Sequence, residues 1–283
     1  MNKMHVTTIC FSPTGTTESV IDHIVSGMGQ DQPSRIDLTN MEKRAVFFAN
    51  PDSFLGETDS VLVGMPVYFG YIPQFLKEKF QSVDGKGRPA AAVVVYGNRD
   101  FDYALKELCS LLESCRFRVV GAAAFVGEHS FSSNLPTAIG RPDREDLLAA
   151  KRFGERLHAS VDKITPIDRE EVPGKKMKHN PAALVKLPNP PKPHYIPSKC
   201  VKCGVCSVGC PMGIIDPRTL QYRDSAARRL CLGCMRCVKK CSQNARVLNL
   251  SPAIKALLKY IFLRKAMKTR REPIIVPNQP VKV

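Results

Sequence analysis

Eight of the eleven cysteines in this 283-residue chain fall in two runs that share one spacing. The first run is Cys200-x2-Cys203-x2-Cys206-x3-Cys210, followed by Pro211, and the second is Cys231-x2-Cys234-x2-Cys237-x3-Cys241. In a chain without a secretory signal, cysteines clustered in this way bind metal more often than they form disulfides. The two runs therefore predict metal–sulfur chemistry within residues 198–250.

The spacing within each run suits a cube of four irons and four sulfides. Three thiolates come from one tight loop, because the x2 spacing brings successive sulfurs onto neighbouring irons, and the fourth cysteine ligates the other cluster. We expect one cluster on Cys200, Cys203, Cys206 and Cys241, and a second on Cys231, Cys234, Cys237 and Cys210. The alternative is zinc, which typically uses pairs of C-x2-C ligands. Two complete runs of the same spacing favour the clusters.

The two runs resemble those of bacterial-type ferredoxins that carry two 4Fe–4S clusters. The resemblance covers residues 198–250 and implies a small ferredoxin-like α+β domain. One departure is Ser242, where the second run would usually have proline. We expect this to alter the local turn and not the ligation.

Several basic residues lie close to the runs, and three cysteines lie outside them. Cationic side chains could stabilise the reduced, more negative form of a cluster, although most of them are equally well explained as solvated surface charges. They are Lys202, Arg228, Arg229, Arg236, Lys239 and Lys240. The remaining cysteines, Cys10, Cys109 and Cys115, fall in an expected strand and helix and are most simply small buried hydrophobes.

The N-terminal part alternates short apolar runs with helical patterns. Strands are expected at residues 6–11, 35–38, 61–63, 90–96 and 118–126. Helices are expected near 20–27, 73–80, 103–115 and 143–163. The run 90–96 is continuously apolar, which is typical of a strand buried on both faces. This alternation predicts a doubly wound α/β fold with five parallel strands. Ligands of such folds bind beyond the carboxyl ends of the strands.

The loop after the first expected strand suits a phosphate group. Ser12, Thr14, Gly15, Thr16 and Thr17 offer four hydroxyls, a tight turn and free backbone N–H groups at a helix start. The loop has no Lys and is therefore not a Walker loop. Serine and threonine also cap helices that bind nothing, so the loop alone does not decide between the two roles.

The loops after the third and fourth expected strands hold aromatic and glycine residues suited to a flat ligand. The candidates are Pro66, Val67, Tyr68 and Gly70 in one loop, and Gly97, Asn98, Arg99, Phe101 and Tyr103 in the other. Each aromatic could instead be ordinary core, but three suitable loops at the correct strand ends favour a flavin. His129, after the fifth strand, could face it from the same side or be a plain loop histidine.

The hydroxyl loop at 12–17 resembles the FMN-phosphate loop of flavodoxins. Over roughly residues 3–250 the chain resembles a flavodoxin-like domain fused to a two-cluster ferredoxin. The resemblance implies FMN as the flavin, and an anaerobic habitat. The chain has no Trp, a common flavin-stacking residue, so the stacking residue is not assigned.

The remaining segments predict a linker and a basic helix. Residues 164–197 hold eight of the 22 prolines and read as a linker, or as a strap packed on the first domain. Residues 253–271 form a basic amphipathic pattern with seven Lys/Arg and no acid. We therefore expect four parts: a flavodoxin-like domain at 1–163, the linker, a ferredoxin-like domain at 198–250, and a helix with a tail at 251–283.

The positive charge of the chain is concentrated in its C-terminal part. Residues 1–165 carry 18 Lys/Arg and 20 Asp/Glu, whereas residues 166–283 carry 24 Lys/Arg and 6 Asp/Glu. This asymmetry predicts an acidic redox partner protein or an anionic membrane surface, and we do not expect nucleic acid to be the partner. The sequence shows no signal peptide and no transmembrane run, so a cytoplasmic location is expected.

Together these features predict electron transfer between FMN and two 4Fe–4S clusters. Two alternatives remain open: a reductase whose flavin acts on a small substrate such as a quinone or nitro compound, and a redox-sensing docking module. No G-x-G-x-x-G motif follows a strand, so nothing supports direct use of NAD(P)H.

Overall fold

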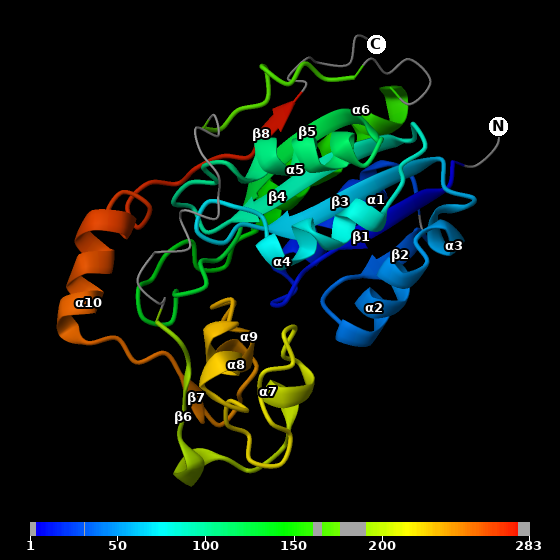
Figure 1. The fold of residues 1–283 in the computed structure, drawn as a ribbon. Coiled ribbons are helices and arrows are strands. Elements are labelled where there is room, and N and C mark those ends of the chain that lie inside the picture. The colour runs from blue at the N-terminus through cyan, green and yellow to red at the C-terminus, as the bar shows by residue number, and fades with distance from the viewer. Residues whose placement is uncertain (1–3, 31, 161–165, 176–190, 277–283) are drawn as a thin grey trace.

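The computed structural model describes residues 4–30, 32–160, 166–175 and 191–276. They form an α/β domain and a smaller cysteine-bearing domain beside one end of its sheet (Figure 1). The strands of the α/β sheet are β1 (Val6–Cys10), β2 (Ser34–Asp37), β3 (Ser60–Pro66), β4 (Pro89–Tyr96), β5 (Arg118–Val126) and β8 (Ile274–Val276). Its helices are α1 (Thr16–Gly27), α2 (Met41–Ala49), α3 (Asp52–Leu55), α4 (Gln74–Lys77), α5 (Ala104–Ser114) and α6 (Arg144–Ser160).

The strand order of the sheet is β2-β1-β3-β4-β5-β8. Strands β1 to β5 are parallel and follow the 2-1-3-4-5 order of flavodoxin-like folds, which confirms the expected fold class. The sheet has one strand more than expected, because β8 pairs antiparallel with the edge of β5, Ala123 opposite Ile275. Strand β8 has only three residues and lies between polar and proline-containing stretches. So short an apolar run does not predict a strand from the sequence.

Helices cover both faces of the sheet, and β4 contributes to both cores. Ala92, Val94 and Tyr96 pack with α2, α4 and α5, whereas the alternate residues Ala91, Val93 and Val95 pack with α1 and α6. Successive side chains of a strand point to opposite faces, so a continuously apolar strand is what this position requires. Asp143 caps the start of α6, since its Oδ1 accepts the Glu145 and Asp146 N–H groups.

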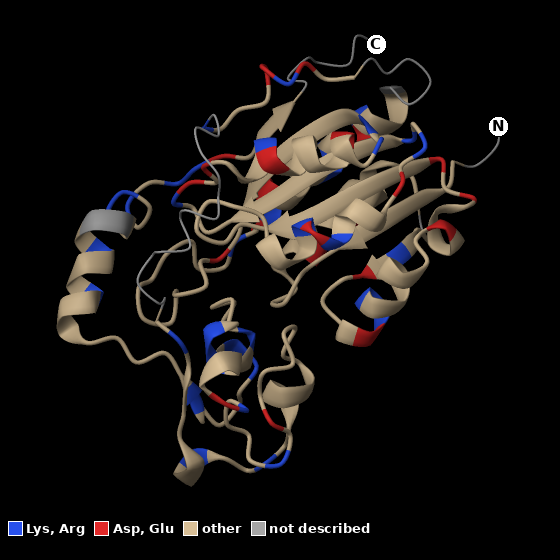
Figure 2. Cartoon of the chain, in the orientation of Figure 1, with Lys and Arg blue, Asp and Glu red and all other residues tan. Residues whose placement is uncertain are grey.

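The cysteine-bearing domain is built from short elements. They are β6 (His194–Tyr195), α7 (Val205–Val208), α8 (Ser225–Arg229), α9 (Arg236–Lys239) and β7 (Arg246–Val247), with β6 and β7 paired antiparallel. Asp224 caps α8 by accepting the Ala227 N–H at 2.7 Å. Lys and Arg predominate over Asp and Glu in this domain, as Figure 2 shows.

The chain after residue 250 returns to the α/β domain. Helix α10 (Pro252–Leu257) continues as a π-helical turn to Leu263, so the expected helix over 253–271 is shorter and less regular. Asn98 holds the segment that follows, because its Nδ2 donates to the carbonyls of Ala266 and Thr269 at 2.7 and 2.8 Å. Strand β8 then completes the return beside β5 (Figure 1).

Part of the expected linker packs on the α/β domain. Val172 is buried in the core on the α5 face, and the Ile167 N–H donates to the Val119 carbonyl at 3.0 Å. The rest of that expected linker, including 176–190, lies outside the described residues, as does the end of the tail from residue 277. No helix in the described ranges is both long and apolar enough to cross a membrane.

Candidate flavin and iron–sulfur sites

The two cysteine runs adopt the same backbone conformation. Lys202 and Gly204 in the first run and Gly233 and Met235 in the second have positive φ values between 58° and 75°. These left-handed residues occupy equivalent places in each run, and a short helix, α7 or α9, follows. The repeated geometry curls each C-x2-C-x2-C loop in the same way.

Cysteines from both runs line one cavity in the cysteine-bearing domain. Cys231, Cys234 and Cys237 of the second run share it with Cys210, the last cysteine of the first run. This is the set predicted for the second cluster, and we call it the inner set. The other walls of the cavity are mainly apolar, among them Pro211, Ile214 and Met235.

The remaining predicted ligands, Cys200, Cys203, Cys206 and Cys241, form what we call the outer set. Backbone N–H groups donate to two of its sulfurs, Lys202 to Cys200 at 3.3 Å and Ala245 to Cys241 at 3.2 Å. A hydrogen bond from the Tyr195 hydroxyl is the main cause that lowers the pKa of Cys200, and the neighbouring charges act in the same sense. Donors directed at sulfur favour the thiolate that a metal needs.

Burial has the opposite effect on the inner set. It raises the pKa of Cys234 to about 12 and raises the pKa of Cys237 still further. Burial therefore disfavours the thiolate form of both residues, and the positive irons of a bound cluster would offset this effect. Within the described ranges, no group of three or more His, Cys, Asp or Glu side chains is arranged to hold a single metal ion.

Two buried cations near the cysteines lack acidic partners in the described part of the chain. Lys192 and Arg246 are 6% and 1% exposed, and neither forms an ion pair there. Lys192 Nζ donates to the carbonyls of Arg228 and Arg229 at 2.6 and 3.1 Å. The Lys192 ammonium also lies near Cys231, whose thiol influences the pKa of Lys192. A buried cation is unfavourable unless an anion compensates it. The donor set and these charges therefore fit clusters of net negative charge.

The loop after β1 presents unsatisfied donors at the start of α1. The backbone N–H groups of Thr14, Thr16 and Thr17 have no acceptor among the described residues, and Gly15 turns the chain with φ 86°. The hydroxyl oxygens of Thr14 and Thr16 lie 3.2 Å apart on the same loop. Ser12 is used internally, because its Oγ accepts the Glu18 N–H at 3.0 Å. The loop thus fits a phosphate group, with the threonines and amides as donors.

The loops after β3 and β4 lie at the same edge, and the structure gives their predicted residues different roles. Pro66 ends β3, and the Val67 N–H donates to the Val95 carbonyl of β4 at 2.9 Å. Tyr68 pairs with Tyr71 in an isolated bridge, and the Gly70 carbonyl accepts the Tyr103 N–H at 2.9 Å. The ring of Tyr103 stacks on that of Tyr71, with 4.9 Å between their centroids.

Three other predicted flavin residues are engaged by the protein itself. Phe101 is buried in the core against Tyr96, as the core alternative described. The Asn98 side chain bonds to the C-terminal segment, and Arg99 pairs with Asp102. Contacts of these three residues with a flavin stay predictions. Gly97, between β4 and Asn98, leaves room for the ring of His129, with which a Cβ at this position would collide.

His129 is held as a neutral imidazole beside the β4 loop. Its Nδ1 accepts the Phe131 N–H at 3.0 Å. Burial, and secondarily the charges of Lys239 and Arg99, lower the pKa of His129 to about 4. At neutral pH it can therefore donate only from Nε2.

The cysteine-bearing domain meets the α/β domain at the edge where these loops lie. Arg236, next to the inner set, donates from Nη1 to the Pro13 carbonyl in the β1 loop. Arg44 Nη2 donates to the Pro211 carbonyl at 2.9 Å. The pKa of Tyr68 is raised by burial first and then by the thiols of Cys234 and Cys231, which places its hydroxyl near them. The inner set is thus directed toward the candidate flavin loops.

Sequence reasoning did not single out two residues at this junction. Phe69 is 54% exposed in the β3 loop and has φ 54°, so it is an aromatic ring presented outward beside Tyr68. Arg236 was considered only as a charge near the cysteines, not as a contact to the β1 loop. The exposed Phe69 could have been noticed from its position between Tyr68 and Gly70, whereas the reach of Arg236 depends on how the domains pack.

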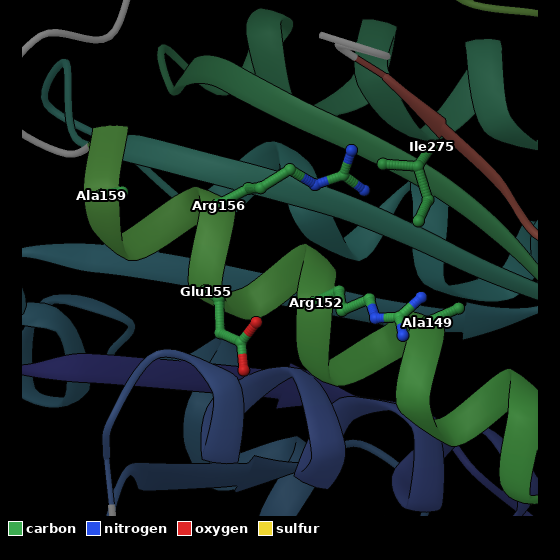
Figure 3. A pocket seen from close by; sticks show the side chains of 6 residues that line it. All are labelled: Ala149, Arg152, Glu155, Arg156, Ala159 and Ile275. Atoms are coloured by element: carbon green, nitrogen blue, oxygen red, sulfur yellow. The ribbon is translucent and has the colours of Figure 1, made fainter. Parts of the chain in front are cut away.

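Another pocket lies away from these loops, between α6 and β8 (Figure 3). It is lined by Ala149, Arg152, Glu155, Arg156, Ala159 and Ile275. None of these residues belongs to the cysteine runs or to the three loops. It is therefore not part of the predicted site.

Comparison with known proteins identifies the class of the C-terminal domain. A family model described as a 4Fe–4S dicluster domain matches residues 199–246, which include all eight cysteines of the two runs. The chain therefore joins a flavodoxin-like α/β domain to a ferredoxin-like 4Fe–4S domain. No curated protein sequence gives a significant match to the chain.

Several solved structures resemble about half of this chain. A flavodoxin from the domain Archaea is 17% identical over 56% of this chain and 99% of its own, with a TM-score of 0.41. The apo form of an NADH:FMN oxidoreductase is 16% identical over 56% of this chain and 90% of its own, with a TM-score of 0.42. Rubredoxin oxygen:oxidoreductase from Desulfovibrio gigas is 14% identical, and the match covers 36% of that chain with a TM-score of 0.43. At these values the fold assignment rests on the strand order of the sheet.

Proposed function

We propose that this chain transfers electrons between an FMN on the flavodoxin-like domain and two 4Fe–4S clusters in the ferredoxin-like domain. FMN exchanges one or two electrons and each cluster exchanges one, so the three groups would link one-electron and two-electron carriers. The observation that carries the proposal is the packing of the inner cysteine set against the edge that bears the three candidate flavin loops.

The residues of this chain have defined tasks in that scheme. Thr14, Thr16 and the free amides of the β1 loop would bind the phosphate of FMN, and Tyr68 and Phe69 would border its ring. Arg236 ties the inner set to the β1 loop, so it would fix the separation between flavin and cluster. The apolar walls around Cys210 and Cys234 would lower the polarity around a cluster held by the inner set.

The arrangement also gives the two clusters an order. The inner set would exchange electrons with the flavin, and the outer set with an external partner. Cys203 is exposed, and the apolar residues around it, Val201, Val205 and Val208, are 64%, 47% and 90% exposed. Exposed apolar side chains at a redox centre suit a transient protein contact.

The test is anaerobic purification followed by analysis of iron, acid-labile sulfide, zinc and flavin. The proposal predicts ~8 iron and ~8 sulfide per chain, one FMN, and no stoichiometric zinc. Stoichiometric zinc, or FAD in place of FMN, would overturn it.

A further inference from the structure

Arg246 is a buried cation whose hydrogen bonds are incomplete. Among the described residues it is the largest fully buried side chain, and it lies on β7 directly across from Tyr195 on β6. One Nη atom donates to the Leu220 carbonyl, but Nε and Nη1 have no partner in the described part of the chain. Burying a guanidinium in this way is strongly unfavourable unless an anion lies nearby.

Two tyrosine rings flank this guanidinium and connect it to both cysteine sets. Its Cζ lies 5.1 Å from the ring centroid of Tyr195 and 5.7 Å from that of Tyr222. The Tyr195 hydroxyl lies near Cys200 of the outer set, since the two groups shift each other's pKa. The Tyr222 hydroxyl lies 3.9 Å from the Sγ of Cys231 in the inner set. Arg246 therefore sits in the middle of a row that reaches one cysteine of each set.

We propose that Arg246 is a counter-charge shared by the two clusters, which raises the reduction potential of both, and that Tyr195 and Tyr222 each tune one cluster. The inference rests on the proposed function. Reduction adds one electron, and so one negative charge, to a cluster. A fixed cation close to both clusters stabilises each reduced form, and burial protects this effect from screening by salt.

The test is a redox titration of the full chain, loaded with its clusters and followed by electron paramagnetic resonance. Arg246→Met is compared with Arg246→Lys, which keeps the charge, and with Arg218→Met, which removes an exposed cation of the same domain. We expect Arg246→Met to lower the equilibrium constant for one-electron reduction of each cluster about tenfold, a fall of ~59 mV in each midpoint. Arg246→Lys should retain most of both potentials, and Arg218→Met should shift them much less.

Two further variants separate the clusters from each other. Tyr195→Phe should lower one midpoint potential and Tyr222→Phe the other, because each removes a hydroxyl dipole that lies near a cysteine of one set. The Tyr222 hydroxyl also donates to the Pro193 carbonyl at 3.1 Å, which fixes its position beside Cys231. If the Arg246→Met chain does not assemble clusters, the two tyrosine variants test the proposal instead. A shift in the midpoint potential of one cluster in each variant supports the row of contacts through Arg246. Unchanged midpoint potentials in both variants overturn it. A loaded Arg246→Met chain with both potentials unchanged, or with only one shifted, refutes a shared counter-charge.

The outcomes distinguish this inference from the proposed function. A wild-type chain without two 4Fe–4S clusters contradicts the proposed function, whatever Arg246 does. A wild-type chain with both clusters and an Arg246→Met variant of unchanged potentials leaves that function intact and removes only the role of Arg246.

Discussion

Cys210 tests the crossed ligand assignment at the scale of one residue. It belongs to the first run but lines the cavity of Cys231, Cys234 and Cys237. Cys210→Ser should therefore damage the inner cluster and leave the outer one, so that iron falls from ~8 to ~4 per chain. Metal analysis and electron paramagnetic resonance measure this, and Cys109→Ser, a buried cysteine outside the runs, is the control. Loss of the outer cluster with an intact inner one would show that the ligands do not cross.

His129 predicts a pH dependence of stability. Its folded pKa of about 4 lies below the usual value, so protonation favours the unfolded chain. The stability that the neutral ring contributes is fully present above pH ~6.5 and is lost as the pH falls toward 4. Between pH 7.5 and 5.5 we expect a loss of about 1 kcal/mol, seen as a lower Tm under argon. His129→Gln should remove this part of the pH dependence, and an equal loss in the variant would assign it to other groups.

The two candidate cysteine sets follow from spacing alone, whereas the roles of the charged residues around them do not. The spacing of the cysteines in a metal-binding run determines the geometry of its loop. The positions of the eight cysteines from Cys200 to Cys241 are therefore enough to define both candidate sets. The roles of Arg236 and Arg246 depend on packing between segments that are distant in the sequence. A buried arginine and a surface arginine look the same in a list of basic residues.

At the scale of elements, the junction of β1 and α1 is the predicted phosphate site. Thr14→Ala combined with Thr16→Ala should weaken FMN binding by ~1.5–3 kcal/mol for each charge-assisted bond lost. Fluorescence titration of the flavin into the apo-flavin chain measures the change. Ser26→Ala, at the exposed far end of α1, is the control and should leave the affinity unchanged. Unchanged affinity in the double variant would move the phosphate to another loop.

Helix α10 and the π-helical turn that follows it form the segment that we propose to contact an anionic membrane surface. Ile254, Leu257 and Tyr260 are 42%, 47% and 62% exposed, and Lys255 and Lys259 are exposed beside them. The replacement Lys255→Gln with Lys259→Gln should weaken binding to phosphatidylserine vesicles by about 2 kcal/mol at low salt, measured by sedimentation. The control is Lys43→Gln with Lys79→Gln, two exposed lysines of the α/β domain.

If the wild-type chain does not bind these vesicles, the membrane role of α10 is wrong and an acidic protein remains the candidate partner. Truncation of the chain after Pro252 would not test the membrane role of α10. It would also remove β8 and the buried Leu263 and Ala266, which pack against Leu135, so it would destabilise the fold.

At the scale of the whole molecule, the sequence was enough to predict each domain but not how the two domains meet. Apolar runs and helical periodicity in the sequence predicted β1 to β5 and α6, because the side chains that these elements bury follow local patterns. Strand β8 was missed because three residues carry little periodic signal. The packing of the inner set on the flavin edge depends on contacts such as Arg44 with Pro211, which no local pattern encodes.

The measurement that tests the central proposal most directly is the rate of electron transfer within one chain. The flavin is reduced by a light flash under anaerobic conditions, and bleaching of the cluster absorbance is followed at several protein concentrations. If the inner set lies against the flavin edge, the clusters are reduced with a first-order rate that does not change with protein concentration. A rate proportional to protein concentration, or no reduction of the clusters, would contradict electron transfer between the two domains of this chain.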